Sequence, residues 1–143
     1  MIKQILMLVF VMFFMSVSAQ EVTGVNYIEK QGNGASRVFT VTVIPQKKIE
    51  DMVDEANRMV IKALLFDGVE NYNAGRPLVD NPNNPFALSL VDQDKRVYKN
   101  YCKETHLEGS DHRTNGHFVV VVNHFNLVRV LNMRKAITTP FSE

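Results

Sequence analysis

The clearest pattern in the chain is an apolar stripe whose members recur at every third or fourth position between residues 49 and 64. Acidic Glu50 and Asp51 open this segment, Lys62 lies near its end, and Asp67-Gly68 supplies a stop. The stripe consists of Ile49, Met52, Val53, Ala56, Met59, Val60, Ala63 and Leu64. This spacing predicts an amphipathic helix of about five turns, with the stripe in the core rather than lining a ligand pocket.

Two segments before this helix predict a β-hairpin. In residues 37–44 (RVFTVTVI) β-branched and aromatic side chains follow one another, which is typical of a strand, and Pro45 ends it. Residues 22–29 are the candidate partner strand. Asn33-Gly34 lies between the two segments and can adopt the positive φ values that a tight turn needs.

A second hairpin is predicted farther along the chain. Residues 117–122 (HFVVVV) indicate a strand that is covered on both faces or central in its sheet. Residues 97–105 (VYKNYCKET) allow two interpretations, because their apolar positions fit one helical face while their two tyrosines and valine favour a strand. We favour the strand because the sequence that follows resembles a hairpin connection.

A final helix is predicted after the second hairpin. Asn123 is a favourable N-cap, and Arg134 and Lys135 close the helix with the sign that the dipole favours. The residues expected to pack inward are Phe125, Leu127, Val128, Val130 and Leu131.

The segment between the hairpins, residues 69–96, is dense in turn-forming residues. Its prolines at 77, 82 and 85 lack an amide donor, so it cannot be a central strand. Asn84 followed by Pro85 is a typical helix start and predicts a short helix over 86–91. Long loops are often functional, and this one either contacts a partner or wraps the sheet edge. The candidate partner-binding residues are Tyr72, Arg76, Leu78 and Phe86.

These elements follow one another in the order β-β-α-β-β-α. Strands paired in hairpins, with helices between and after them, indicate an antiparallel sheet of about four strands with the two main helices on one face. The predicted fold class is therefore α+β, a two-layer sandwich.

The first residues of the chain change the picture of where the protein acts. Lys3 precedes an unbroken apolar run over residues 5–15, and Val17 and Ala19 occupy the small-residue positions of a signal-peptidase site. The run is well short of the roughly 20 residues of a membrane-spanning helix, so no stable membrane insertion is expected after cleavage. We predict a cleaved signal peptide over 1–19, a single globular domain over 20–143, and a periplasmic or secreted location.

Charge and cysteine content narrow the classes of partner. Without Lys3, the chain has 15 basic residues against 15 acidic ones, so neither nucleic acid nor an anionic membrane is an expected partner. A single cysteine, Cys102, cannot form an internal disulfide, so packing alone must hold the domain together.

The order of several short motifs resembles a group of small exported proteins of Bacteroidota. The motifs are GNG and RVFTVTV within 32–43, ANRMVIKALLFDGV at 56–69, RPLV at 76–79 and FVVVVNHFNLVRVL at 118–131. Gln20, directly after the predicted cleavage site, is similar to exported proteins of the same phylum. The resemblance implies a shared fold and an exported location, and it brings no catalytic residues.

The stretch HLEGSDHRTNGH, residues 106–117, is the candidate metal site. It contains the right ligand atoms for zinc or another divalent metal, and His124 could approach it from the final helix. Neither a Cys-x-x-Cys nor a His-Glu-x-x-His pattern is present, and Asn115-Gly116 equally suggests a hairpin turn. The candidate ligands are His106, Glu108, Asp111, His112 and His117.

Catalytic motifs are absent from the sequence. Cys102 would need a base within hydrogen-bond reach, and along a strand His106 would lie roughly 13 Å away. The chain has no Gly-x-Ser-x-Gly elbow and neither of the glycine-rich nucleotide motifs. We expect no enzymatic activity and no cofactor. We expect a non-catalytic binding or interaction module of the cell envelope that contacts a protein, peptide or envelope component through a sheet edge or the 69–96 loop. The alternatives are a divalent-metal-binding protein that uses the 106–117 loop and a small hydrolase.

Overall fold

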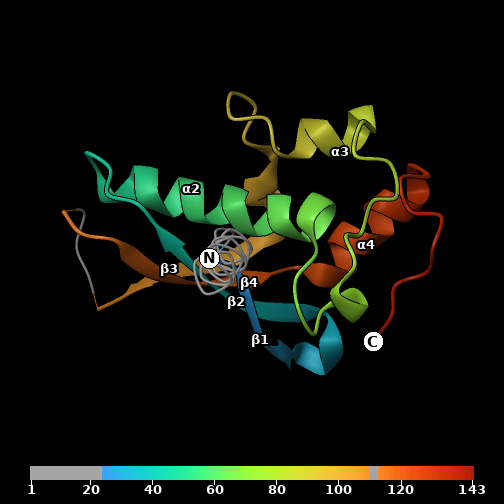
Figure 1. Ribbon diagram of the computed structural model, residues 1–143, viewed down its shortest axis with the longest axis horizontal. Coiled ribbons are helices and arrows are strands. Elements are labelled where there is room, and N and C mark those ends of the chain that lie inside the picture. Colours follow the sequence, from blue (N-terminus) through green and yellow to red (C-terminus); the bar gives the residue numbers. More distant parts are fainter. Residues whose placement is uncertain (1–23, 110–112) are drawn as a thin grey trace, which may run out of the picture.

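A computed structural model describes residues 24–109 and 113–143 (Figure 1). The predicted signal peptide, residues 1–19, lies outside the described residues. The principal elements are β1 (Asn26–Gln31), β2 (Ser36–Val43), α2 (Ile49–Lys62), α3 (Pro85–Leu90), β3 (Cys102–Glu108), β4 (Gly116–Val122) and α4 (His124–Met133). A π-helical turn, Ala63–Asp67, extends α2, and a 3₁₀ helix, Val97–Tyr101, precedes β3. Across these residues no helix is both long enough and apolar enough to span a membrane.

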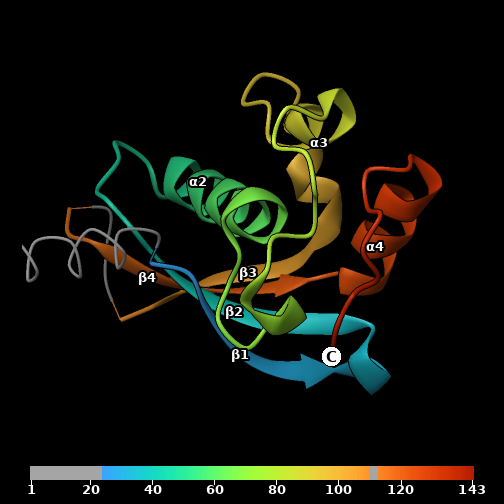
Figure 2. The same cartoon turned by 45° about the vertical axis from the view of Figure 1, so that its right-hand side comes forward.

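The strands form one antiparallel sheet in the order β1-β2-β4-β3. Figures 1 and 2 show α2 and α4 on the same face of this sheet. The predicted α+β fold, the four strands and the order of the main elements are thereby confirmed. Both edge strands contain a bulge, which lies at Ile28 in β1 and at Lys103 in β3.

The core lies between the sheet and α2. The inward-facing residues of β2 are Phe39, Val41 and Val43. In the ladder with β4, Phe39 is paired with Val120 and Val41 with Phe118, and Val122 is in the same core. Met52, Ala56 and Val60 of α2, and Leu64 of the π-helical turn that extends it, cover them and have no exposed surface. The stripe predicted from the spacing is therefore the core face of α2.

The turn-rich loop after α2 is part of the packed structure. The amide of Leu78 donates to the carbonyl of Leu64, and the amide of Val79 donates to the carbonyl of Leu65. At the end of the π-helical turn Gly68 has a φ of +83°, and a Cβ at this position would lie 2.4 Å from the carbonyl oxygen of Gly75. The loop approaches so closely here that only glycine fits.

The predicted helix caps are present. The side-chain oxygen of Asn84 accepts a hydrogen bond from the amide of Ala87, and that of Asn123 accepts one from the amide of Asn126. The first hairpin also turns as expected, with φ of +59° at Asn33 and +85° at Gly34.

The prediction of a strand over residues 97–105 was wrong in its first half. Residues 97–101 form the 3₁₀ helix, and β3 begins at Cys102. The cause is tertiary. Arg96 takes a left-handed conformation that turns the chain, and the buried Tyr98 hydroxyl donates to Oδ2 of Asp54 on α2 at 2.7 Å. The first strand likewise begins later than predicted, at Asn26.

The inward packing predicted for Phe125 was also wrong. Leu127 and Leu131 of α4 are fully buried, but Phe125 is 61% exposed. Both sides of this short helix carry apolar residues, and the chain attaches α4 to the sheet through the leucines. Phe125 lines a groove beside α4 instead.

Candidate functional site

A groove of about 630 Å³ lies between the β1–β2 turn and α4. The turn contributes residues 32–35 to one side, and α4 contributes the other side. The amide of Phe125 donates to the carbonyl of Ala35, which fixes the start of α4 against this turn. The groove therefore has two walls whose relative position is set by the backbone.

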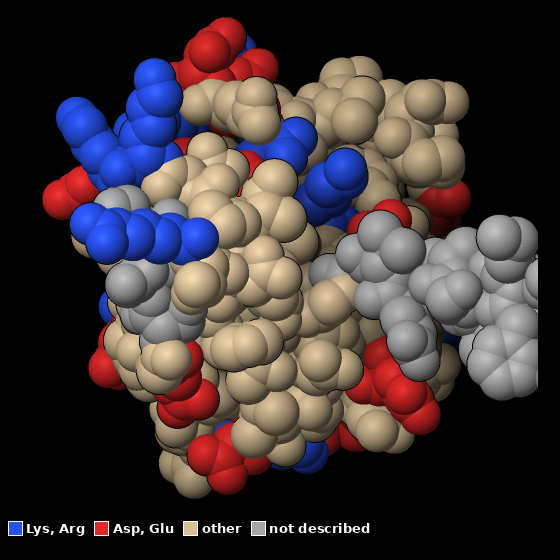
Figure 3. Space-filling view, turned by 60° about the vertical axis from the view of Figure 1, so that its left-hand side comes forward, with Lys and Arg blue, Asp and Glu red and all other residues tan. Residues whose placement is uncertain are grey.

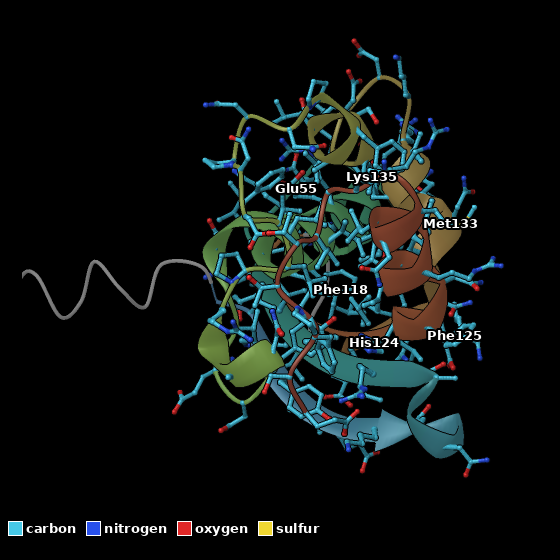
Figure 4. All side chains as sticks on the ribbon, turned by 90° about the vertical axis from the view of Figure 1, so that its right-hand side faces the viewer. Glu55, Phe118, His124, Phe125, Met133 and Lys135 are labelled. Atoms are coloured by element: carbon cyan, nitrogen blue, oxygen red, sulfur yellow. The ribbon has the colours of Figure 1, made fainter. Side chains whose placement is uncertain are left out.

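The α4 wall of the groove combines apolar side chains, two of them exposed to solvent, with the polar His124, Arg129 and Asn132. Phe125 and Met133 are 61% and 71% exposed, and Val128 lies half-buried between them. Figure 4 shows Phe125 and Met133 along the outer side of α4, with His124 on the side nearer the sheet. Large exposed apolar side chains are ordinary when scattered, but a row beside a concave surface is typical of an interaction site.

Arg37 provides a fixed positive charge at the base of the groove. It belongs to the inward-facing set of β2, and only 4% of its side chain is exposed. Its Nε donates to the carbonyl of Gly34 at 3.4 Å, and its Nη2 donates to Glu143 Oε1 at 2.9 Å. The guanidinium carbon lies 5.4 Å from the centre of the Phe141 ring. A buried guanidinium requires such partners, because an unpaired charge in the interior is strongly destabilising.

His124 is the second polar group at the base of the groove. It is buried, and its Nδ1 lies 2.7 Å from the hydroxyl oxygen of Tyr72 in a hydrogen bond. Burial, and then the neighbouring Arg37, lower the pKa of His124 to about 4, although Glu143 acts in the opposite direction. The imidazole is therefore uncharged at neutral pH, and the positive charge at the base of the groove is that of Arg37.

The chain after α4 returns to this base. Ala136 and Ile137 are buried, and the last six residues, 138–143, which we call the final segment, run without regular structure to Arg37. The amide of Thr138 donates to Asp80 at 2.6 Å, and the amide of Ser142 donates to Asn73 Oδ1 at 2.9 Å.

The carboxylate of Glu143 is the anion that pairs with Arg37. It also pairs with Lys30 of β1, and these two hydrogen bonds lower the pKa of Glu143 below its usual value. The two partners of the Arg37 pair differ sharply in exposure, because the Glu143 side chain is 62% exposed while that of Arg37 is 4% exposed.

The candidate metal ligands that the structure describes lie on the second hairpin. Glu108 and His117 are directly opposite one another on β3 and β4, and His117 Nδ1 lies 3.1 Å from the Thr42 hydroxyl. His106 is paired with Val119, and its ring nitrogens lie 3.8 Å from Glu104 and 4.0 Å from Glu108. Within residues 24–109 and 113–143 no group of three or more histidine, cysteine or acidic side chains is placed to hold a metal ion. Asp111 and His112 lie outside the described residues.

The four candidate partner-binding residues do not form one surface, although Arg76 and Leu78 line the same small groove. Tyr72 is fully buried and Leu78 is 2% exposed, so in this conformation both stabilise the core. Phe86 is half-buried, and the Arg134 guanidinium lies 5.1 Å from the centre of its ring. Arg76 is exposed beside a second, smaller groove of about 290 Å³. The structure does not bring the four together.

The contacts of Cys102, and those of Asp54 on α2, are structural. Burial raises the pKa of the Cys102 thiol to about 12, so it is not a thiolate at neutral pH. Asp54 accepts the Tyr98 hydrogen bond and lies 3.2 Å from Lys99 Nζ, which attaches the 3₁₀ helix to α2.

The surface carries both signs of charge. In Figure 3 basic and acidic side chains both occur on the face that is shown, among uncharged areas. This mixed distribution agrees with the balanced composition of the chain.

Sequence reasoning missed the base of the groove. Arg37 shares the inward-facing set of β2 with Phe39, Val41 and Val43, so a charged residue at an inward position was a usable signal. Glu143 is 106 positions away in sequence, and nothing local connects it with Arg37.

The described residues form an α+β fold with a small open groove beside α4. Comparison of the chain with models of known protein families, with curated proteins and with solved structures gave no match.

Proposed function

We propose that this protein is an exported, non-catalytic binding module of the cell envelope, and that it binds a segment of another protein in the groove beside α4. The observation that carries the proposal is the set of apolar side chains that line the groove, the exposed Phe125 and Met133 and the half-buried Val128, next to the buried Arg37. An apolar wall provides affinity, and a few fixed polar groups provide orientation.

The size and shape of the groove favour a peptide segment. It is open along α4, and its volume of about 630 Å³ is within the usual range for ligand sites. The apolar side chains that α4 contributes to the groove, Phe125, Val128 and Met133, offer a surface on which the apolar residues of a peptide segment can pack. We therefore place the contact here rather than on a sheet edge or on the 69–96 loop, whose Tyr72 and Leu78 are buried.

The polar groups at the base are suited to binding. The His124 ring nitrogen Nδ1 is engaged by Tyr72, and the low pKa makes the imidazole a poor general base at neutral pH. The thiol of the half-buried Cys102, whose pKa is raised to about 12, is also protonated at neutral pH. These features support a role in recognition over one in catalysis.

The test begins with selection of peptides from a random displayed library on the purified chain. We expect selected peptides to shift backbone amide NMR signals of residues 32–37 and of α4. Replacing Phe125 and Met133 together by serine should then weaken binding at least tenfold, which corresponds to about 1.4 kcal/mol.

A matched control removes two exposed apolar side chains away from the groove. Ile44 and Leu88 are 67% and 46% exposed, and Ile44→Ser with Leu88→Ser should leave affinity unchanged. Equal losses in the two double variants, or signal shifts confined to other regions, would contradict the proposal.

A further inference from the structure

We infer that the groove recognises an acidic segment with an aromatic residue two positions before a carboxylate, and that the chain's own final segment occupies the base of the groove as an intramolecular competitor. This inference rests on the proposed function and specifies its ligand and its regulation. The inferred ligand follows from the two side chains that contact Arg37 in this structure, those of Phe141 and Glu143.

The final segment shows which chemistry the base accepts. The ring of Phe141 lies 4.5 Å from the ring of His124 and 5.2 Å from that of Tyr72, measured between centres. The same ring lies beside the Arg37 guanidinium, and two positions later Glu143 pairs with that guanidinium. An aromatic ring and a carboxylate, spaced by one residue, thus fill one cationic and aromatic recess.

The Arg37–Glu143 pair favours exchange of its anion. Arg37 is held in the interior and needs an anion at all times, because an uncompensated buried charge is strongly unfavourable. Glu143 is largely exposed, so its carboxylate loses little hydration in the pair, and the cost of its release comes from leaving the buried Arg37 unpaired. Replacement of one carboxylate by another is therefore the favourable way to open the base, and a ligand that brings its own carboxylate satisfies Arg37 throughout.

The charge of the groove favours an anionic ligand. Of the charged residues that line it, Arg37 and Arg129 are positive and Glu143 is negative. Lys30 contacts Glu143 from β1 and adds a further positive charge. Once Glu143 leaves, the recess is entirely cationic, which attracts an acidic segment and orients it along the apolar wall.

The final segment is attached so that it can be released locally. Ala136 and Ile137 are buried and hold its beginning, whereas Thr138 and Glu143 are exposed. Release of residues 138–143 breaks the Thr138–Asp80 and Ser142–Asn73 hydrogen bonds and removes the half-buried Phe141 ring from Tyr72 and His124, but it leaves the anchor at 136–137 in place.

The test uses a fluorescein-labelled synthetic peptide with the sequence of residues 136–143, Ala-Ile-Thr-Thr-Pro-Phe-Ser-Glu, and the full chain. In fluorescence anisotropy titrations, Glu143→Gln should bind this probe about tenfold more tightly than the unaltered chain, because the internal competitor is weakened. Glu50→Gln, which neutralises an exposed acid in the first turn of α2, should bind like the unaltered chain. Thermal unfolding of each variant confirms that it is folded.

The chemistry of the ligand is tested with altered probes on Glu143→Gln. Changing the phenylalanine of the probe to alanine, or its glutamate to glutamine, should each weaken binding about tenfold. Arg37→Lys in the Glu143→Gln chain should do the same, because lysine lacks the planar fork of arginine. Equal binding of all probes would overturn the inferred chemistry of the ligand. Displacement of the probe by inorganic phosphate, at the concentration at which unlabelled peptide displaces it, would also overturn it.

Failure of this inference is distinguishable from failure of the proposed function. If the unaltered chain and Glu143→Gln bind the probe equally, or if neither binds it, the competitor role of the final segment is wrong. Peptides selected from the library that map to α4 would still support the proposed function, and loss of that mapping is what would contradict it.

Discussion

Helices α2 and α4 lie on the same face of the same sheet, yet they use their apolar residues differently. On α2 every apolar side chain is buried or half-buried, and charged residues occupy the outer side. On α4 Leu127 and Leu131 are buried while Phe125 and Met133 face solvent. The apolar surface of α2 is covered within the fold, whereas part of the apolar surface of α4 is exposed to solvent.

The difference is what the proposed function requires, because it assigns stability to the α2 side and recognition to the α4 side. Burial of a stripe such as that of α2 is the main source of free energy for a domain without disulfides. An exposed Phe125 contributes little to folding and adds a surface that water solvates poorly. The asymmetry suggests that the α4 side is the region in which a partner completes the burial.

The strongest test of this comparison exchanges one phenylalanine in each region for alanine. Phe118 lies under α2 and is 1% exposed, so Phe118→Ala should lower the unfolding free energy of the protein by about 3–5 kcal/mol because a cavity remains. Phe125→Ala should change it by less than about 0.5 kcal/mol. Urea denaturation measures both. A large loss at Phe125 would show that the α4 face belongs to the core.

Two glycines with positive φ give the next largest contrast. Gly68→Ala should destabilise the protein by about 2–3 kcal/mol, because the new Cβ would collide with the carbonyl of Gly75 where α2 meets its loop. Gly32 lines the groove, and a Cβ there would meet nothing within 4 Å. Gly32→Ala should therefore cost only about 1 kcal/mol of backbone strain. Equal costs would remove the distinction between a packed α2 end and an open groove.

The pH dependence of stability tests the base of the groove. The folded-state pKa of His124 is about 4 against an ordinary value of 6.5, so the unfolded chain binds its proton first. The stability that neutral His124 contributes is present above about pH 6.5 and is lost as the pH falls toward 4.

Substitution isolates this contribution from that of the carboxylates. Between pH 7 and pH 4 the unfolding free energy of the unaltered chain should fall by about 2 kcal/mol more than that of His124→Asn. This is less than the whole pKa shift of His124 would give, because solvent screens part of the interaction. Denaturant midpoints at several pH values measure the difference. Parallel profiles for the two proteins would mean that His124 titrates alike in the folded and unfolded states.

Much of the fold was predictable because it is encoded in local periodicity. Helix α2, strands β2 and β4 and the Asn84 and Asn123 caps each follow from residues within a few positions of one another. Residues 97–101 could not be assigned in this way, because the Tyr98–Asp54 contact across 44 positions decides their conformation.

The groove was not predictable for a similar reason. Apolar residues occupy both sides of α4, so periodicity does not tell which side meets the sheet, and Phe125 was assigned to the wrong one. Arg37 stands at an inward position of β2, but its partner Glu143 comes from the far end of the chain. Only the folded arrangement joins the two into one site.

The bulges in β1 and β3 have a consequence for how copies of the protein behave at high concentration. An edge strand with a flat, regular backbone is a template on which another chain can add, and this is a common origin of aggregation. Here each outer strand is interrupted at Ile28 or Lys103, and β3 also exposes Glu104, His106 and Glu108 along its length. Irregular backbone at both margins, with charge along β3, opposes edge-to-edge pairing of sheets from two copies.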